Sequence, residues 1–327
     1  MSWSSLLNLL NWTTVLLSIS IVTRALIPTL QWFALNPTAE VADAVATEEG
    51  SVPASKKEKP APWLMFVSIS SLSTFGLTMY VAIVPRFESP TSWSDIGWYF
   101  GWSTLLWSAG HLCIVISLTI LVAAMFNVVY SSIFTIATIL AAVPILGEVL
   151  RWSDAAGAAV LVVGVAVMTA VRSKDELVVR TWKYALGIGL AVLGGVLTGI
   201  AGALDSKITS SFQVSTYMIF RLGLPALVIA IIFGVKPSDV FKYIRSNWKI
   251  ALATSGCITV SAVVFLEVYQ DARGLGFLTA LLQLNVFITY FIGVLLKKEK
   301  DERYVHYLAL FAMTLSVIGV YVMSLKT

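Results

Sequence analysis

Charged residues are scarce in this sequence. Asp, Glu, Lys and Arg make up 12% of the 327 residues and apolar residues make up 58%, which gives a mean hydropathy of +0.86. A water-soluble protein of this size carries roughly 25% charged residues. The composition therefore excludes an ordinary soluble domain, and it predicts an integral multi-pass membrane protein whose surroundings are mostly the lipid bilayer.

Cysteine and histidine are almost absent. Cys113 and Cys257 both lie inside apolar runs, so neither a disulfide framework nor a metal site is predicted. The two histidines, His111 and His306, exclude a His-rich membrane metalloenzyme, and they would be the only ligands available to a bis-His haem. We therefore predict no metal and no cofactor.

The chain also lacks a strong excess of charge of either sign. The net charge of +4 is small, and its placement between apolar runs suits membrane topology rather than a nucleic-acid partner. The N-terminus has no basic stretch typical of a cleaved signal peptide. No nucleotide-binding loop is present, so ATP-driven transport is not predicted. Apart from two arginines, the buried ionisable residues are too scattered to form an acid–base pair, and an enzyme is not predicted.

Ten apolar runs are long enough to cross a bilayer as helices. The hydrocarbon core, about 30 Å thick, takes roughly 20 residues per helix, and it cannot satisfy exposed backbone groups. The predicted spans are residues 12–35, 63–85, 97–120, 123–146, 153–172, 183–204, 212–235, 249–269, 274–296 and 304–325. The one long polar segment, residues 36–62, is rich in Ala, Pro, Glu and Lys and is predicted to be a disordered loop.

Basic residues predict the orientation of these spans. Fifteen Lys and Arg residues lie in the odd-numbered loops between spans, whereas five lie in the even-numbered loops and the tails. Because Lys and Arg accumulate in cytoplasmic loops, we expect the odd loops in the cytoplasm and both termini on the other side.

An acidic break between two apolar runs occurs once in each half of the chain. In the first half, Glu148 lies sixteen residues before Gly164, and in the second half Glu302 lies seventeen residues before Gly319. The repetition of this helical hairpin indicates a duplicated membrane protein.

Residues 117–168 resemble the closing three-helix part of an EamA-type repeat of the drug/metabolite transporter superfamily. The resemblance rests on Ile145-Leu146-Gly147-Glu148 and on the Gly-rich run from Gly157 to Gly164-Val165. A looser second copy lies in residues 249–323, where Glu299 or Glu302 stands for the acidic residue and Gly319-Val320 for the final pair. Nucleotide-sugar and triose-phosphate transporters are among the relatives that the resemblance suggests.

The resemblance implies an all-α membrane fold of about ten helices in two inverted five-helix repeats, residues 1–175 and 176–327. It also implies a secondary transporter that moves a small organic metabolite by alternating access, with its substrate site near the midplane. We expect a monomer or a homodimer. The competing interpretation is a non-transporting membrane scaffold or receptor-like subunit.

Two arginines lie in the middle of predicted spans. Arg24 and Arg221 are each followed four residues later by a proline, Pro28 and Pro225. An arginine at the centre of a membrane helix costs about 2.5–3.5 kcal/mol on insertion scales, so it normally faces a partner or a watery cavity. We predict that both arginines bind an anionic group of the substrate; the alternative is a structural role. Tyr217 lies one turn before Arg221 and could share its site.

Four further polar residues occupy comparable places in the fourth span of each half. They are Asn127 and Tyr130 in the first half, and Gln283 and Asn285 in the second. Such side chains can line a substrate site or hold helices together through hydrogen bonds, each worth about 0.6 kcal/mol on average. Both interpretations stay open.

Three other intramembrane features favour structural roles. His111 is expected to pack against a carbonyl rather than carry protons, and Glu267 is expected to pair with Arg273 rather than relay protons. Gly195 and Gly199 form a GxxxG pattern, which permits close helix approach and is expected to act within the monomer.

Overall fold

A computed structural model gives the fold of the chain. It describes residues 12–35, 61–83, 93–147, 149, 152–170, 181–210 and 212–271, together with the single positions 285, 288, 289, 307, 310, 311, 314, 315 and 318. The predicted spans 274–296 and 304–325 fall outside these continuous ranges, as does the predicted loop 36–62.

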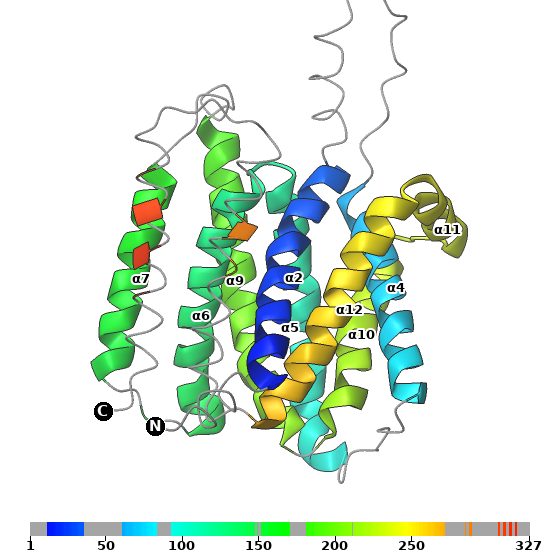
Figure 1. Cartoon of the computed structure of the whole chain (residues 1–327), viewed down its shortest axis with the longest axis horizontal. Coiled ribbons are helices and arrows are strands. Elements are labelled where there is room, and N and C mark those ends of the chain that lie inside the picture. Colours follow the sequence, from blue (N-terminus) through cyan, green and yellow to red (C-terminus); the bar gives the residue numbers. More distant parts are fainter. Residues whose placement is uncertain are drawn as a thin grey trace, which may run out of the picture.

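The described continuous ranges are almost entirely helical (Figure 1). The helices are α2 (Trp12–Leu35), α4 (Pro62–Ile83), α5 (Trp93–Leu118), α6 (Ala123–Leu146), α7 (Trp152–Ala170), α9 (Thr181–Thr209), α10 (Val214–Ile232), α11 (Pro237–Ser246) and α12 (Trp248–Asp271). Eight of them coincide with predicted spans, which confirms the all-helical prediction for this part of the chain. The closely spaced third and fourth spans are separate helices, joined by residues 119–122.

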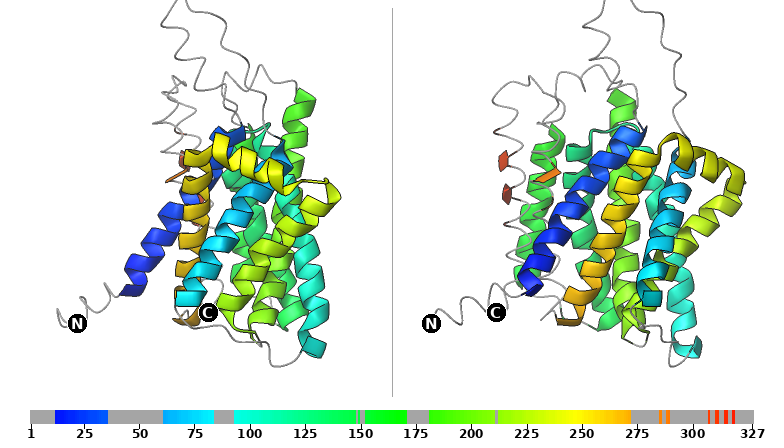
Figure 2. Two further views of the ribbon diagram at one scale, coloured as in Figure 1. Left: turned by 90° about the vertical axis from the view of Figure 1, so that its right-hand side faces the viewer. Right: turned by 45° about the vertical axis from the view of Figure 1, so that its right-hand side comes forward.

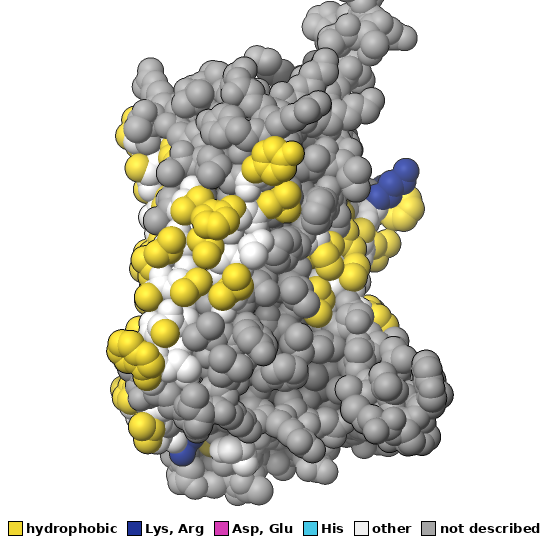
Figure 3. Space-filling view, turned by 60° about the vertical axis from the view of Figure 1, so that its left-hand side comes forward, with side chains coloured by type: hydrophobic (Ala, Val, Ile, Leu, Met, Phe, Trp, Pro, Cys, Tyr) yellow, Lys and Arg dark blue, Asp and Glu magenta, His cyan; other side chains and the backbone are white. Residues whose placement is uncertain are grey.

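Five of the described helices are long and apolar enough to cross a membrane. They cover Pro62–Ile83, Ile96–Leu118, Met125–Leu146, Trp182–Thr209 and Val214–Ile232. Large apolar side chains such as Phe75, Leu105 and Ile231 lie on the outside of the bundle. In the space-filling view of Figure 3, described side chains are mostly hydrophobic, and Lys or Arg shows at just two places. This surface matches a hydrocarbon environment.

The helices of the two halves interleave rather than forming two separate bundles. α5 and α6 both pack along α9, α2 packs along α12, and α4 packs along α10 and α12. Figures 1 and 2 show α2 beside α12 and α4 beside α10. The largest core cluster, which includes Met65, Leu118 and Phe126, lies among these contacts.

Glycines allow α9 to lie close against α5 and α6. A Cβ atom built on Gly199 would lie 2.6 Å from the Cβ of Ala137 and 2.7 Å from the carbonyl oxygen of Phe134. On the other side of α9, a Cβ on Gly110 of α5 would lie 2.5 Å from Cγ2 of Thr198. The GxxxG pattern therefore packs within the chain, as the sequence predicted.

Gly147 ends α6 in a left-handed conformation. Its φ of +72° suits a residue without a Cβ atom, and its N–H donates to the carbonyl of Val143. This is a common way to terminate a helix, and it explains the glycine of the Leu146-Gly147 pair. The adjacent Glu148 lies outside the described residues.

The short helix α11 was not predicted from the sequence. It lies outside the bundle at the end from which α12 starts (Figure 2). Tyr243 anchors it in the core, where burial raises the pKa of the phenol, while Phe241 is 73% exposed. The sequence predicts a basic loop for this segment, which carries Lys242 and Arg245.

Close packing of α9 leads to a stability prediction. Gly199→Ala forces the methyl group into Ala137 and the backbone of α6, so we expect a loss of about 1–3 kcal/mol in the free energy of unfolding in detergent. Gly189→Ala, on the same helix with nothing within 4 Å of its built Cβ, is the matched control and should not lower stability. Equal stability of the two variants would contradict the packing described.

Candidate functional site

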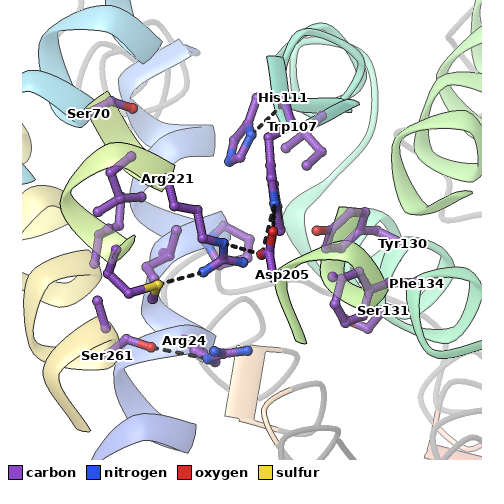
Figure 4. A pocket seen from close by; sticks show the side chains of 18 of the residues that line it. Arg24, Ser70, Trp107, His111, Tyr130, Ser131, Phe134, Asp205, Arg221 and Ser261 are labelled. Atoms are coloured by element: carbon purple, nitrogen blue, oxygen red, sulfur yellow. Dashed lines mark hydrogen bonds and ion pairs between the residues drawn. The ribbon is translucent and has the colours of Figure 1, made fainter. Parts of the chain in front are cut away.

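A cavity of about 300 Å³ lies inside the helix bundle (Figure 4). Side chains from α2, α4, α5, α6, α9, α10 and α12 line it. Both predicted arginines, Arg24 and Arg221, reach this one cavity, although they come from different halves of the chain. The cavity therefore brings together positions almost 200 residues apart, as expected for a site between two halves.

Asp205, near the end of α9, accepts hydrogen bonds from three side chains. The hydroxyl of Ser103 donates to Oδ1 at 2.6 Å, the hydroxyl of Tyr217 donates to the same oxygen, and the indole N–H of Trp107 lies 3.0 Å from Oδ2. These donors come from α5 and α10. Asp205 therefore ties the last turn of α9 to two neighbouring helices.

Arg221 forms an ion pair with the same carboxylate. Its Nε lies 2.8 Å from Oδ2 of Asp205, and the two side chains are 19% and 14% exposed. Nε makes no hydrogen bond of good geometry there, so the attraction is mainly Coulombic. The guanidinium also lies over the indole ring of Trp107, with its carbon 4.1 Å from the ring centroid. A cation held on an aromatic face and beside a carboxylate can remain charged inside an apolar bundle.

The described contacts leave part of the Arg221 guanidinium available. Nη1 donates to the sulfur of Met218 at 3.4 Å, and sulfur is a weak acceptor. Nη2 has no hydrogen-bond partner among the described residues. Arg221 can therefore donate to a further anionic acceptor in the cavity.

Arg24 lies on another side of the cavity. Its Nε donates to the hydroxyl of Ser261 at 3.1 Å, which joins α2 to α12 (Figure 4). Pro28, one turn later, also lines the cavity.

Asn127 and Asn285 lie against each other across the cavity wall. The Nδ2 atom of Asn127 donates to Oγ1 of Thr289 at 2.9 Å and lies 3.5 Å from Oδ1 of Asn285. The hydroxyl of Ser131 donates to Oδ1 of Asn127 at 3.1 Å. Thr289 in turn contacts the carbonyl of Ala25 on α2. These amides line the cavity and also hold helices together through hydrogen bonds. They therefore have the positions expected for lining a site and for joining helices.

Three aromatic rings on α6 form one wall of the cavity. Phe126 and Tyr130 are stacked, with ring centroids 5.3 Å apart and planes inclined by 12°. Phe134 follows one turn later, 6.0 Å from Tyr130. All three line the cavity, and their spacing of four residues places them on one face of the helix.

His111 has the structural contact expected of it. Its Nδ1 lies 2.7 Å from the carbonyl oxygen of Trp107, which requires the ring to donate from that nitrogen. The ring also packs against Phe66, with centroids 4.8 Å apart. Among the described residues no group of three or more His, Cys, Asp or Glu could hold a metal ion.

Six of the seven residues predicted from the sequence line the cavity. They are Arg24, Arg221, Tyr217, Asn127, Tyr130 and Asn285. Gln283 lies outside the described residues, as does the side chain of Glu267. That these residues bind substrate stays a prediction.

Asp205 and Trp107 were missed. The sixth span was ended at Leu204, so Asp205 was assigned to a loop, whereas α9 continues to Thr209. The signal was present in the sequence: Asp205 directly follows an apolar run in which glycines allow close packing. The sequence analysis gave Arg221 no carboxylate partner, whereas the structure pairs it with Asp205 in a partly buried position.

Comparison with known proteins identifies the fold but not a family. No family model matches the chain, and no curated protein matches it. A solved structure described only as a protein crystal structure is similar, with 15% sequence identity and a TM-score of 0.54. That similarity covers 91% of this chain and 98% of the other. At this identity it establishes a shared fold alone.

The ion pair gives the site its first test. Asp205→Asn leaves the Arg221 cation partly buried without its carboxylate, so we expect a loss of about 3 kcal/mol in the free energy of unfolding. Lys207→Gln, an exposed position on the same helix, serves as the control and should have little effect. The double variant Asp205→Asn, Arg221→Gln removes both charges and should recover part of the loss. Purely additive losses would contradict the pairing.

Proposed function

We propose that this chain is a secondary transporter that moves a small organic anion across a membrane by alternating access. The observation that carries the proposal is the cavity inside the bundle, into which Arg24 and Arg221 both project. Charged side chains inside a membrane are costly and normally mark a substrate or ion pathway. The volume, about 300 Å³, lies at the lower end of the range for small-molecule sites.

A multi-pass location in the membrane follows from five helices that are long and apolar enough to span it. The basic helix α11 gives the sidedness. Lys236, Lys242, Arg245 and Lys249 lie in or beside it, and basic connections favour the cytoplasm. The end of the bundle that carries α11 therefore faces the cytoplasm.

The helix contacts support an architecture of two inverted repeats. α2 opens the first half and packs along α12, the third long helix of the second half. α9 opens the second half and packs along α5, the third helix of the first half. α4 and α10, the second helices, pack on each other. This exchange of equivalent contacts is what a two-fold relation between residues 1–175 and 176–327 would produce.

Two pairs of polar contacts follow the same relation. Arg24 on α2 bonds Ser261 on α12, while Asp205 on α9 bonds Ser103 on α5. In each pair, the charged residue of an opening helix meets a serine of the third helix of the other half. Asn127 and Asn285, at comparable places in the two fourth spans, approach each other within 3.5 Å. Equivalent residues meet where a two-fold axis passes between them.

The EamA-like assignment is part of the proposal. It rests on the hairpin motif, and the helix end at Gly147 agrees with the Leu-Gly-Glu pattern. Inverted repeats in secondary transporters place the substrate near the midplane between the halves. The cavity, whose lining comes from both halves, matches that location.

The hydrogen bonding of Asp205 favours an anion over a cation. An ionised carboxylate offers about four lone-pair sites. Ser103, Trp107 and Tyr217 donate to this carboxylate, and the Arg221 cation lies 2.8 Å from its Oδ2. A cationic solute would need to displace one of these donors, whereas an anionic solute can use the free donor capacity of Arg221.

Purified full-length protein in liposomes tests the transport proposal. We expect uptake of organic anions by the native chain and a loss of at least about tenfold in the double variant Asp205→Asn, Arg221→Gln, because that variant keeps the local charge balance but removes the cationic donor. Lys207→Gln is the control. The absence of flux across a broad panel of metabolites would favour a scaffold or receptor-like subunit. Unchanged uptake in the double variant would remove Arg221 from the site.

A further inference from the structure

We infer that the solute is an organic monocarboxylate with an apolar body about the size of one aromatic ring. This inference rests on the proposed function and names the substrate class of the same cavity. It follows from three features of the cavity. They are the polar lining groups that are already hydrogen bonded within the protein, the donors that are left for a solute, and the side chains that cover the rest of the cavity wall.

Most polar groups of the lining are satisfied within the protein. The hydroxyls of Thr138, Ser206 and Thr209 donate to carbonyls of their own helices. The hydroxyl of Tyr130 is hydrogen bonded to that of Thr198 at 3.1 Å, and Asn127 is occupied by its network. A solute with many hydroxyl groups, such as a sugar, would find few free partners and would lose its bonds to water without replacement.

The guanidinium of Arg221 offers a strong donor to the cavity. Arg221 is oriented by Asp205 and by the Trp107 ring, and its Nη2 has no partner among the described residues. A planar guanidinium in this orientation matches the plane of a carboxylate. Arg24 and Arg221 bring two positive charges to the cavity and Asp205 brings one negative charge, so a solute with one negative charge balances the site better than a solute with two.

One wall of the cavity is largely aromatic. Phe126, Tyr130 and Phe134 line it along α6, and Phe66 and Ile69 line it from α4. Aromatic rings prefer offset-stacked or edge-to-face contacts with other rings. With about 300 Å³ available, the cavity accommodates a single ring with its carboxylate.

Benzoate is the probe that tests this inference, and benzamide and gluconate are its matched comparisons. Benzamide keeps the ring without the charge, and gluconate keeps the carboxylate on a polyhydroxylated body. We expect benzoate to raise the unfolding temperature of the purified full-length protein, and to bind at least about tenfold more tightly than either comparison in calorimetry. The double variant Asp205→Asn, Arg221→Gln should lose the preference for benzoate over benzamide.

The outcomes separate the substrate class from the transport proposal. Binding of benzoate without flux in liposomes would support the ligand class and overturn transport. Flux of gluconate or glucose 6-phosphate, with no binding of benzoate, would leave transport intact and overturn the ligand class. Equal binding of benzoate and benzamide would also overturn it, because recognition would then not depend on the charge.

The variant Phe134→Leu tests the contact with the aromatic wall. If the ring of benzoate stacks on α6, this variant should weaken the binding of benzoate more than it weakens the binding of acetate.

Discussion

The partly buried ion pair between Asp205 and Arg221 is the interaction on which the rest of the site depends. Neither charge could lie in the bundle alone without a large desolvation cost. Together they are neutral as a unit, and the contacts of Asp205 with Ser103 and Trp107 connect α5, α9 and α10. The pair therefore holds helices from both halves of the chain at the cavity, and it orients the Arg221 guanidinium, whose Nη2 has no hydrogen-bond partner among the described residues.

Many other polar side chains of the described helices are hydrogen bonded within the protein. Serine and threonine hydroxyls donate to carbonyls one turn earlier on their own helices, as Ser73 and Thr135 do. Glycines at Gly110 and Gly199 bring backbones together where larger residues would separate them. The outside is apolar and the inside is hydrogen bonded.

The sequence was sufficient to locate most helices and both arginines. Apolar runs of about 20 residues are constrained by the thickness of the bilayer, so spans such as 123–146 were predicted with the bounds of α6. A charge in the middle of such a run is conspicuous, which is why Arg24 and Arg221 were identified. That both arginines line one cavity could not be predicted in this way. It depends on how the helices of the two halves pack together, and the local hydrophobic pattern carries no information about that packing.

The features that were missed lie at the ends of apolar runs. Asp205 comes after the last long apolar stretch of α9, where a hydropathy pattern cannot distinguish a final helical turn from a loop. α11 is too short and too charged to produce a membrane signal. Trp107 resembles many other tryptophans in the sequence until its ring is seen to lie against Arg221. In each case tertiary contacts decide the role of the residue.

Accessibility of the cavity from the two sides of the membrane tests alternating access most directly. Ser70 lines the cavity on α4, and Ser70→Cys can be made after the two native cysteines, Cys113 and Cys257, are replaced by alanine. A membrane-impermeant thiol reagent would then be applied to oriented vesicles from one side or the other. Alternating access predicts labelling from each side, and protection from both sides by a solute that binds. Labelling confined to one side under all conditions, or absent from both, would contradict it.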